Sequence, residues 1–115
     1  MQLSNQENEY YNRQIILDNF GLDAQLKLKQ ARILVVGAGG LGCPVLQYLS
    51  AAGIGNIGIL DGDVVSISNL HRQILFSIID IGKKKAIVAK EKLIAQNPNI
   101  SIESFEENIT VNNAI

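Results

Sequence analysis

A short polar segment, residues 61–73, gathers several side chains that could hold an anionic ligand. Its sequence, DGDVVSISNLHRQ, contains two aspartates, Asn69, the single histidine His71, and Arg72. An amide donates hydrogen bonds, and a guanidinium adds a permanent charge whose planar geometry suits phosphate oxygens. The segment therefore predicts a site for a phosphorylated ligand, with Asn69 and Arg72 beside the phosphates.

A glycine-rich turn, GAGGLG at residues 37–42, is a second candidate for phosphate binding. Gly37, Gly39 and Gly42 satisfy the G-x-G-x-x-G pattern between an expected strand and an expected helix, where the pattern has meaning. Glycine lets a phosphate approach the backbone N–H groups at a helix N-terminus. A tight turn without a ligand is the alternative, although four glycines in six residues lose more backbone entropy than a simple turn requires.

Asp61 closes the expected second strand, 19 residues after Gly42. A carboxylate at this place can accept hydrogen bonds from ribose hydroxyls, which predicts a nucleotide. The alternative role, a cap on the DGD turn, fits Asp63 better, because Asp63 lies past the strand and is free to bond nearby amides. NAD, FAD and adenine nucleotides all use such a crevice, and Asn69 with Arg72 favours a triphosphate.

Three consecutive lysines, residues 83–85, fall in the first turn of an expected helix. The helix dipole disfavours cations at that end, so a compensating anion is expected nearby. A solvated helix face explains Lys83 and Lys84 equally well, because neither has a reason to point inward.

Alternating strands and helices position these side chains. Apolar spacing predicts two helices within residues 6–30, broken near Gly21. The apolar run at 32–36 predicts a strand buried on both faces of a parallel sheet. Further strands are predicted at 56–61 and 100–109, and helices at 41–52, ending at Gly53, and from about 81 to 96, capped by Asp80 and ended by Asn97 and Pro98.

This order of elements predicts an α/β fold. Strand, helix, strand, helix, strand is one mononucleotide-binding half of a Rossmann-like doubly wound parallel sheet, here preceded by two helices, with the strand order three, two, one. We expect residues 1–115 to form this one nucleotide-binding unit. The second half of such a sheet is lacking, which predicts an exposed apolar edge and either a fragment or an obligate oligomer.

Composition limits the classes of function. The 115 residues are 47% hydrophobic and 18% charged, which predicts one soluble globular domain. A net charge of −1 gives no general attraction to nucleic acid or acidic membranes. The longest run without a polar side chain, 33–46, is shorter than the roughly 18 residues of a membrane span. The lack of a signal-peptide pattern and a single cysteine predict a cytoplasmic protein.

Three segments together resemble a known family. The segments YNRQIIL, ILVVGAGGLGCPVLQYLSAAGIGNIGILDGDVVSISNLHRQ and IGKKKAIVAKEKL…NP resemble, in order and spacing, the N-terminal half of the ThiF/MoeB family, bacterial relatives of ubiquitin-activating enzymes. The resemblance spans Tyr11 to Pro98. It implies a homodimeric adenylyltransferase that uses ATP and magnesium to activate the C-terminal glycine carboxylate of a ubiquitin-like sulfur-carrier protein, for thiamine or molybdopterin synthesis.

The resemblance also implies roles for single residues. Gly40, with Gly39 beside it, matches the glycine that lies against the nucleotide, and Asp61 matches the carboxylate that holds the ribose. Lys85 matches a lysine that reaches the phosphates, and Arg13 resembles an arginine that crosses the dimer interface to the partner's ATP. The matching nucleotide-binding segment is Ser68, Asn69, Leu70, His71 and Arg72, and the implied catalytic residues are Arg13, Arg72 and Lys85.

A general base, a metal site and a reactive cysteine are not expected among these residues. The attacking carboxylate is already ionised near neutral pH, so His71 is expected to be structural or a nucleotide contact rather than a base. The magnesium-binding aspartate, reactive cysteine and zinc-binding cysteines of the family lie beyond residue 115, so no metal site is predicted, and Cys43 is expected to pack as a small apolar residue. The alternatives are a nucleotide-binding or dimerising module without activity, and an NAD-dependent oxidoreductase module.

Overall fold

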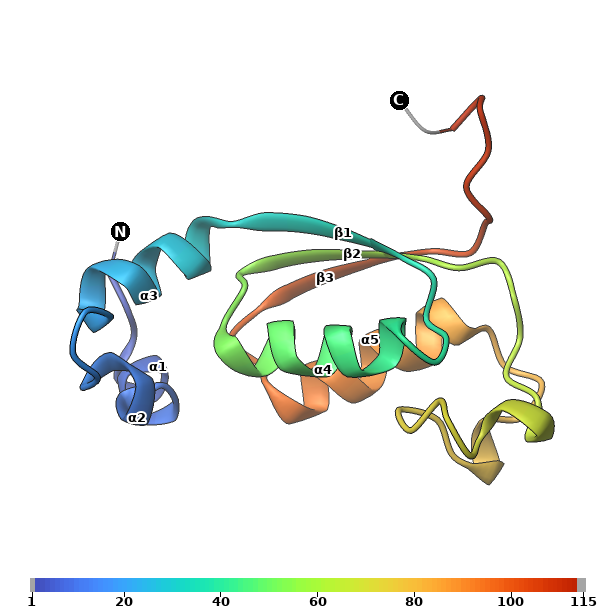
Figure 1. Cartoon of the computed structure of the whole chain (residues 1–115), viewed down its shortest axis with the longest axis horizontal. Helices are drawn as coiled ribbons and strands as arrows, with labels where there is room; N and C mark the ends of the chain where they lie inside the picture. Colours follow the sequence, from blue (N-terminus) through green and yellow to red (C-terminus); the bar gives the residue numbers. More distant parts are fainter. Residues whose placement is uncertain (1, 114–115) are drawn as a thin grey trace.

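A three-stranded parallel sheet with two helices against one face forms the body of the molecule (Figure 1). The computed structural model describes residues 2–113. The strands lie in the order β1-β2-β3, so β2 is central, as the sequence predicts. Their bounds are β1 Arg32–Val36, β2 Asn56–Leu60 and β3 Ser101–Phe105, and the register aligns Arg32 with Asn56 and Asn56 with Ser101.

The two crossover helices follow the first two strands. Helix α4 (Gly42–Ala52) ends at Gly53, whose φ of 98° is a left-handed conformation that glycine adopts without steric cost. Helix α5 (Lys85–Gln96) ends at Asn97, as predicted. Both helices lie on the same side of the sheet (Figure 1), and the core forms between them and the strands. Its fully buried side chains include Leu46, Ile59, Val65 and Leu93.

The start of α5 differs from the prediction. Asp80 does not cap this helix; it closes a short 3-10 helix, η2 (Ile78–Asp80), where its Oδ2 accepts the backbone N–H of Ser77 at 2.9 Å. The same carboxylate pairs with the ammonium of Lys92 at 2.6 Å. These bonds occupy Asp80, so α5 begins only at Lys85. The third strand also ends at Phe105 rather than at residue 109.

Three short helices precede the sheet and lie beside one end of it (Figure 1). The predicted break at Gly21 is present, with a φ of 73°, but the first piece is itself divided at Tyr11. The Tyr11 hydroxyl accepts Nδ2 of Asn97 at 2.7 Å, and Nδ2 of Asn97 also donates to the Ser50 carbonyl at 2.8 Å. These buried bonds anchor the layer to the sheet domain. The helices are α1 (Asn5–Tyr10), α2 (Asn12–Ile15) and α3 (Gly21–Gln30).

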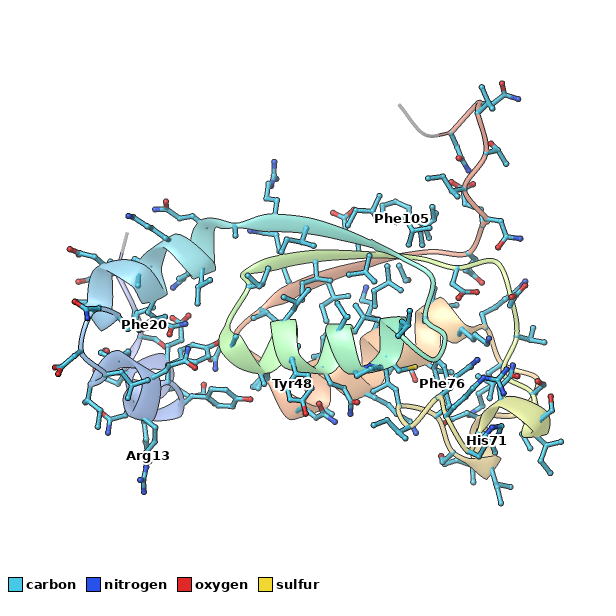
Figure 2. All side chains as sticks on the ribbon, in the orientation of Figure 1. Arg13, Phe20, Tyr48, His71, Phe76 and Phe105 are labelled. Carbon is cyan, nitrogen blue, oxygen red and sulfur yellow. The ribbon has the colours of Figure 1, made fainter. Side chains whose placement is uncertain are left out.

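The other face of the sheet is open, which contradicts the predicted burial of the first strand on both faces. Helices α4 and α5 cover one side only, and the side chains of Leu34 and Val36 remain 54% and 51% exposed. Phe105 lies on the same uncovered side (Figure 2) and lines, with Leu34 and Gly58, a shallow groove of about 360 Å³. Within residues 2–113, β1 pairs only with β2, so the expected free edge is also present.

Candidate functional site

The glycine turn joins the end of β1 to the start of α4. The N–H of Gly37 donates to the Leu60 carbonyl at 2.8 Å, which ties the turn to β2. Gly37 has a φ of 94°, and a Cβ at Gly42 would collide with the carbonyl oxygen of Gly37. The fold itself therefore requires glycine at these two positions.

Gly39 and Gly40 have no such steric reason to be glycine. A Cβ at Gly39 would lie 3.8 Å from Nε2 of Gln73, and one at Gly40 would lie 3.6 Å from Cδ of Arg72, both ordinary van der Waals distances. A Cβ would therefore fit at both glycines, in contact with a polar side chain. Close approach of a ligand to the backbone is one physical reason for glycine at such positions.

Asp61 lies directly after β2 and links it to the turn. Its Oδ2 accepts the N–H of Ala38 at 2.8 Å, and its Oδ1 accepts the N–H of Asp63 at 2.8 Å. The turn-capping role predicted for Asp63 therefore belongs to Asp61, whereas Asp63 is exposed. A carboxylate has about four acceptor positions, so the nearly buried Asp61 retains capacity for a ribose hydroxyl.

The polar segment after β2 brings Arg72 to the turn. A short 3-10 helix, η1 (Ile67–Asn69), precedes it, and Oδ1 of Asn69 accepts Nη2 of Arg72 at 3.2 Å. Because the Arg72 stem lies against Gly40 and its guanidinium is held by Asn69, a forked cation stands beside the turn. His71 is exposed, with Nε2 3.5 Å from Nη1 of Arg72.

The two remaining residues of the predicted binding segment have contacts elsewhere in the chain. Ser68 is exposed, and its hydroxyl lies 3.3 Å from the hydroxyl of Ser66. Leu70 is partly buried and packs against the core, which gives it a structural role.

Lys85 is the buried member of the lysine run. It is 5% exposed, whereas Lys83 and Lys84 are exposed, and Nζ of Lys84 donates to the Gly62 carbonyl at 3.5 Å. The N–H of Lys85 donates to the Asp63 carbonyl at 3.1 Å, and the N–H of Val65 donates to the Lys83 carbonyl at 2.8 Å. These bonds fix the start of α5 beside the end of β2. Among residues 2–113 no ion pair or hydrogen bond is formed by the Lys85 ammonium, which is not among the buried atoms without a partner, so the stem is buried while the charged end stays open to solvent or a ligand.

Cys43 lies beneath the turn and is fully buried. Its thiol donates to the Ala38 carbonyl at 3.4 Å. Burial raises the pKa of the Cys43 thiol, although a hydrogen bond from the Leu75 backbone and the charge of Lys85 partly oppose this. A thiol of raised pKa is a poor nucleophile near neutral pH, so Cys43 packs as a small apolar side chain, as expected.

Gln73 borders the glycine turn, and the sequence interpretation did not single it out. It is 4% exposed, and its Oε1 is buried without a hydrogen-bond partner in the described structure. It ends the segment SNLHRQ, directly after Arg72, but nothing in its type distinguishes it from a surface glutamine. Only its burial against Gly39 reveals it.

Arg13 is the predicted residue that the fold does not bring to the turn. It is exposed on α2, and Figure 2 places it at the opposite end of the molecule from His71. The turn instead gathers Gly39, Gly40, Asp61, Asn69 and Arg72.

Within residues 2–113 no group of three or more His, Cys, Asp or Glu could hold a metal ion, and no helix is long and apolar enough to cross a membrane.

Comparison with known proteins gives consistent matches. The ThiF family model matches residues 11–115. The sulfur carrier protein adenylyltransferase of Thermus thermophilus is 47% identical over 115 residues, which is 100% of this chain and 42% of the relative. A crystal structure of PaaA matches with a TM-score of 0.87 and 37% identity, over 94% of this chain and 36% of PaaA.

A structure with nucleotide also matches. The crystal structure of E. coli MccB with ATP gives a TM-score of 0.73 and 42% identity, over 75% of this chain and 25% of MccB. The chain therefore spans less than half the length of each of these proteins. At these identities the superpositions agree with the Rossmann-like parallel sheet that the sequence predicts.

Proposed function

Because this chain belongs to the ThiF family, we propose that it carries the nucleotide-binding part of an adenylyltransferase for a ubiquitin-like sulfur-carrier protein. One observation carries the proposal: the Arg72 side chain lies against Gly40, held by Asn69, beside two glycines that the fold itself does not require. A forked cation over an open backbone turn suits a phosphate chain. The similar Thermus thermophilus protein is a sulfur carrier protein adenylyltransferase, which supports the substrate class.

The proposed reaction joins two anions. A carboxylate oxygen of the carrier's C-terminal glycine attacks the α-phosphorus of ATP. The new O–P bond gives an acyl-adenylate, while the bond to the bridging oxygen breaks and pyrophosphate leaves with the electron pair. Catalysis then consists mainly of positioning and charge neutralisation, without a protein nucleophile. Arg72 and Lys85 neutralise the phosphates, and Asp61 orients the ribose.

Lys85 contributes a cation on a buried stem. Its ammonium makes no ion pair among the described residues, so it is free to pair with a phosphate oxygen. Ser68, Asn69 and His71 extend the nucleotide site, while Leu70 holds this segment against the core. His71 is a contact rather than a general base, because the carboxylate has no proton to lose near neutral pH.

Magnesium, implied with ATP by the resemblance, does not find its ligands in this part of the chain. Residues 2–113 hold no cluster of metal-ligating side chains. Magnesium bound to nucleotides takes much of its coordination from phosphates and water, with one or two carboxylates. In this proposal the charge of the phosphates is met within residues 2–113 by Arg72 and Lys85.

A homodimer gives Arg13 its function. The residue is exposed and too distant from its own glycine turn to take part there (Figure 2). In the proposed dimer it reaches the phosphates bound to the partner subunit and adds a third cation to that site.

We propose a cytoplasmic location. The ATP requirement and the single buried thiol both suit the cytoplasm.

Carrier-dependent exchange of labelled pyrophosphate into ATP tests the proposal. Exchange should require a carrier with a free C-terminal glycine, and a carrier lacking that glycine is the matched control. Nucleotide binding without exchange would identify a binding module instead. Protection against thermal unfolding by NADH but not by ATP would identify an oxidoreductase module. Parallel assays with thiamine-type and molybdopterin-type carriers then assign the pathway.

A further inference from the structure

We infer that Gln73 is an additional nucleotide-binding residue, whose carboxamide donates a hydrogen bond to a phosphate oxygen lying over Gly39. The identity of this ligand rests on the proposed function. The position of the side chain rests on the structure alone, because Nε2 lies 3.8 Å from where a Cβ of Gly39 would be.

The amide nitrogen of Gln73 is a free donor. Gln73 is 4% exposed and its Oε1 is buried without a partner, whereas Nε2 donates to no described residue and is not among the buried atoms without a partner. An unpaired buried oxygen makes glutamine less favourable here than an apolar side chain such as methionine. The open donor beside the glycine turn is therefore the part of the side chain that a ligand can use.

Gln25 shows what a structural glutamine looks like in the same molecule. It is fully buried, its Nε2 donates to the Ala52 carbonyl at 3.1 Å, and its Oε1 accepts the amide of Gln14. Both ends of that carboxamide are used within the chain. The contrast indicates that the donor of Gln73 is available to a ligand.

The backbone aims Gln73 at the glycine turn. Its N–H donates to the Asn69 carbonyl at 2.9 Å, and its own carbonyl accepts the N–H of Phe76 at 3.1 Å. Consecutive residues thus face consecutive glycines, Arg72 at Gly40 and Gln73 at Gly39. A phosphate chain over the turn meets a cation at one glycine and a neutral donor at the next.

The substitution Gln73→Met tests this inference, with Gln25→Met as the matched control. ATP affinity is measured by calorimetry, and thermal stability is measured without nucleotide. Loss of one hydrogen bond to a charged ligand should weaken ATP binding about tenfold or more. Gln73→Met should retain or raise the Tm of the free protein. Gln25→Met should lower the Tm and leave the ATP affinity of the folded protein unchanged.

A charged variant locates the contact on the ligand. Gln73→Glu keeps the side-chain length but brings an anion to the phosphates, so it should weaken ATP binding more than Gln73→Met does and leave adenosine binding nearly unchanged. Equal losses for ATP and adenosine would overturn the phosphate contact. If the wild type binds ATP and Gln73→Met binds it equally well, this inference alone fails. If the wild type binds no ATP, the proposed function fails as well.

Discussion

The Asp61 carboxylate accepts the backbone N–H of Ala38 at 2.8 Å. This bond connects the end of β2 to the glycine turn that follows β1, and it lies in the interior, since Ala38 is fully buried and Asp61 nearly so. The second oxygen accepts the N–H of Asp63. One side chain therefore holds together the two loops that border the proposed nucleotide site, before any ligand is bound.

Asp61→Ala should destabilise the protein and also weaken ATP binding. Each buried N–H left without an acceptor costs about 1–3 kcal/mol, and Asp61 satisfies the N–H of Ala38 in the buried turn. Urea unfolding followed by circular dichroism measures this loss. Asp63→Ala is the control, because that side chain is exposed and should change stability by no more than about 0.5 kcal/mol. Similar losses for both variants would contradict the structural role of Asp61.

Lys85→Met should leave the stability of the free protein nearly unchanged while abolishing its response to ATP. Methionine can replace the buried stem, and the ammonium that is lost has no ion-pair or hydrogen-bond partner among the described residues. Thermal melts with and without ATP provide both readouts. Lys84→Met, one position earlier and exposed, should leave both nearly unchanged. A lower Tm for Lys85→Met without ATP would show that its ammonium already has a stabilising partner.

The ion pair between Asp80 and Lys92 should make the free energy of unfolding fall at acid pH. Burial raises the pKa of Asp80, but hydrogen bonds from Lys92 and Ser77 outweigh it, so the net pKa is lowered. A lowered pKa contributes stability that is present above the unfolded value of about 3.9 and is lost as the pH falls through the folded value. The free energy of unfolding should therefore fall on acidification below about pH 4.

Asp80→Asn separates this contribution from that of other carboxyl groups. The variant should be less stable than the wild type at pH 7, because it loses the charge paired with Lys92. The gap should narrow as the pH falls below about 4, because the unfolded carboxyl then binds a proton that the folded one still resists. A gap that stays constant between pH 7 and pH 3 would exclude the titration of Asp80 as its cause.

Arg13→Ala should reduce pyrophosphate exchange in the full-length enzyme without reducing ATP binding by a separated subunit. The reason is the position of Arg13, at the opposite end of the molecule from its own site (Figure 2). Equal loss in both measurements would refute a role across the interface. Mixed dimers give a sharper test: combining Arg13→Ala subunits with Arg72→Ala subunits should restore exchange, since one site then has both arginines.

Local sequence patterns were sufficient for most of the fold. The bounds of β1, the residues of α4 and the glycine turn follow from apolar runs and from glycines whose conformations the chain requires, such as Gly37 and Gly42. The strand order follows from right-handed crossovers. These features depend on neighbours in the sequence, so the sequence alone specifies them well.

The errors concern residues whose partners are distant in sequence. Asp80 has the type of a helix cap, but Ser77 and Lys92 compete for its carboxylate and move the start of α5 to Lys85. The apolar run of β1 predicts burial on both faces, but α4 and α5 cover only one. Gln73 was missed because burial of a glutamine is decided by tertiary packing.

The open face of the sheet separates two properties of this molecule. Leu34, Val36 and Phe105 expose apolar area there, whereas Gly40, Asp61 and Arg72 lie at the carboxyl ends of the strands. A helix, strand or second subunit that packs on this open apolar face would therefore add to stability without altering the proposed phosphate contacts. Substitutions that tune solubility or assembly can accumulate on one surface while nucleotide chemistry stays intact on the other, so each can evolve, or be engineered, on its own.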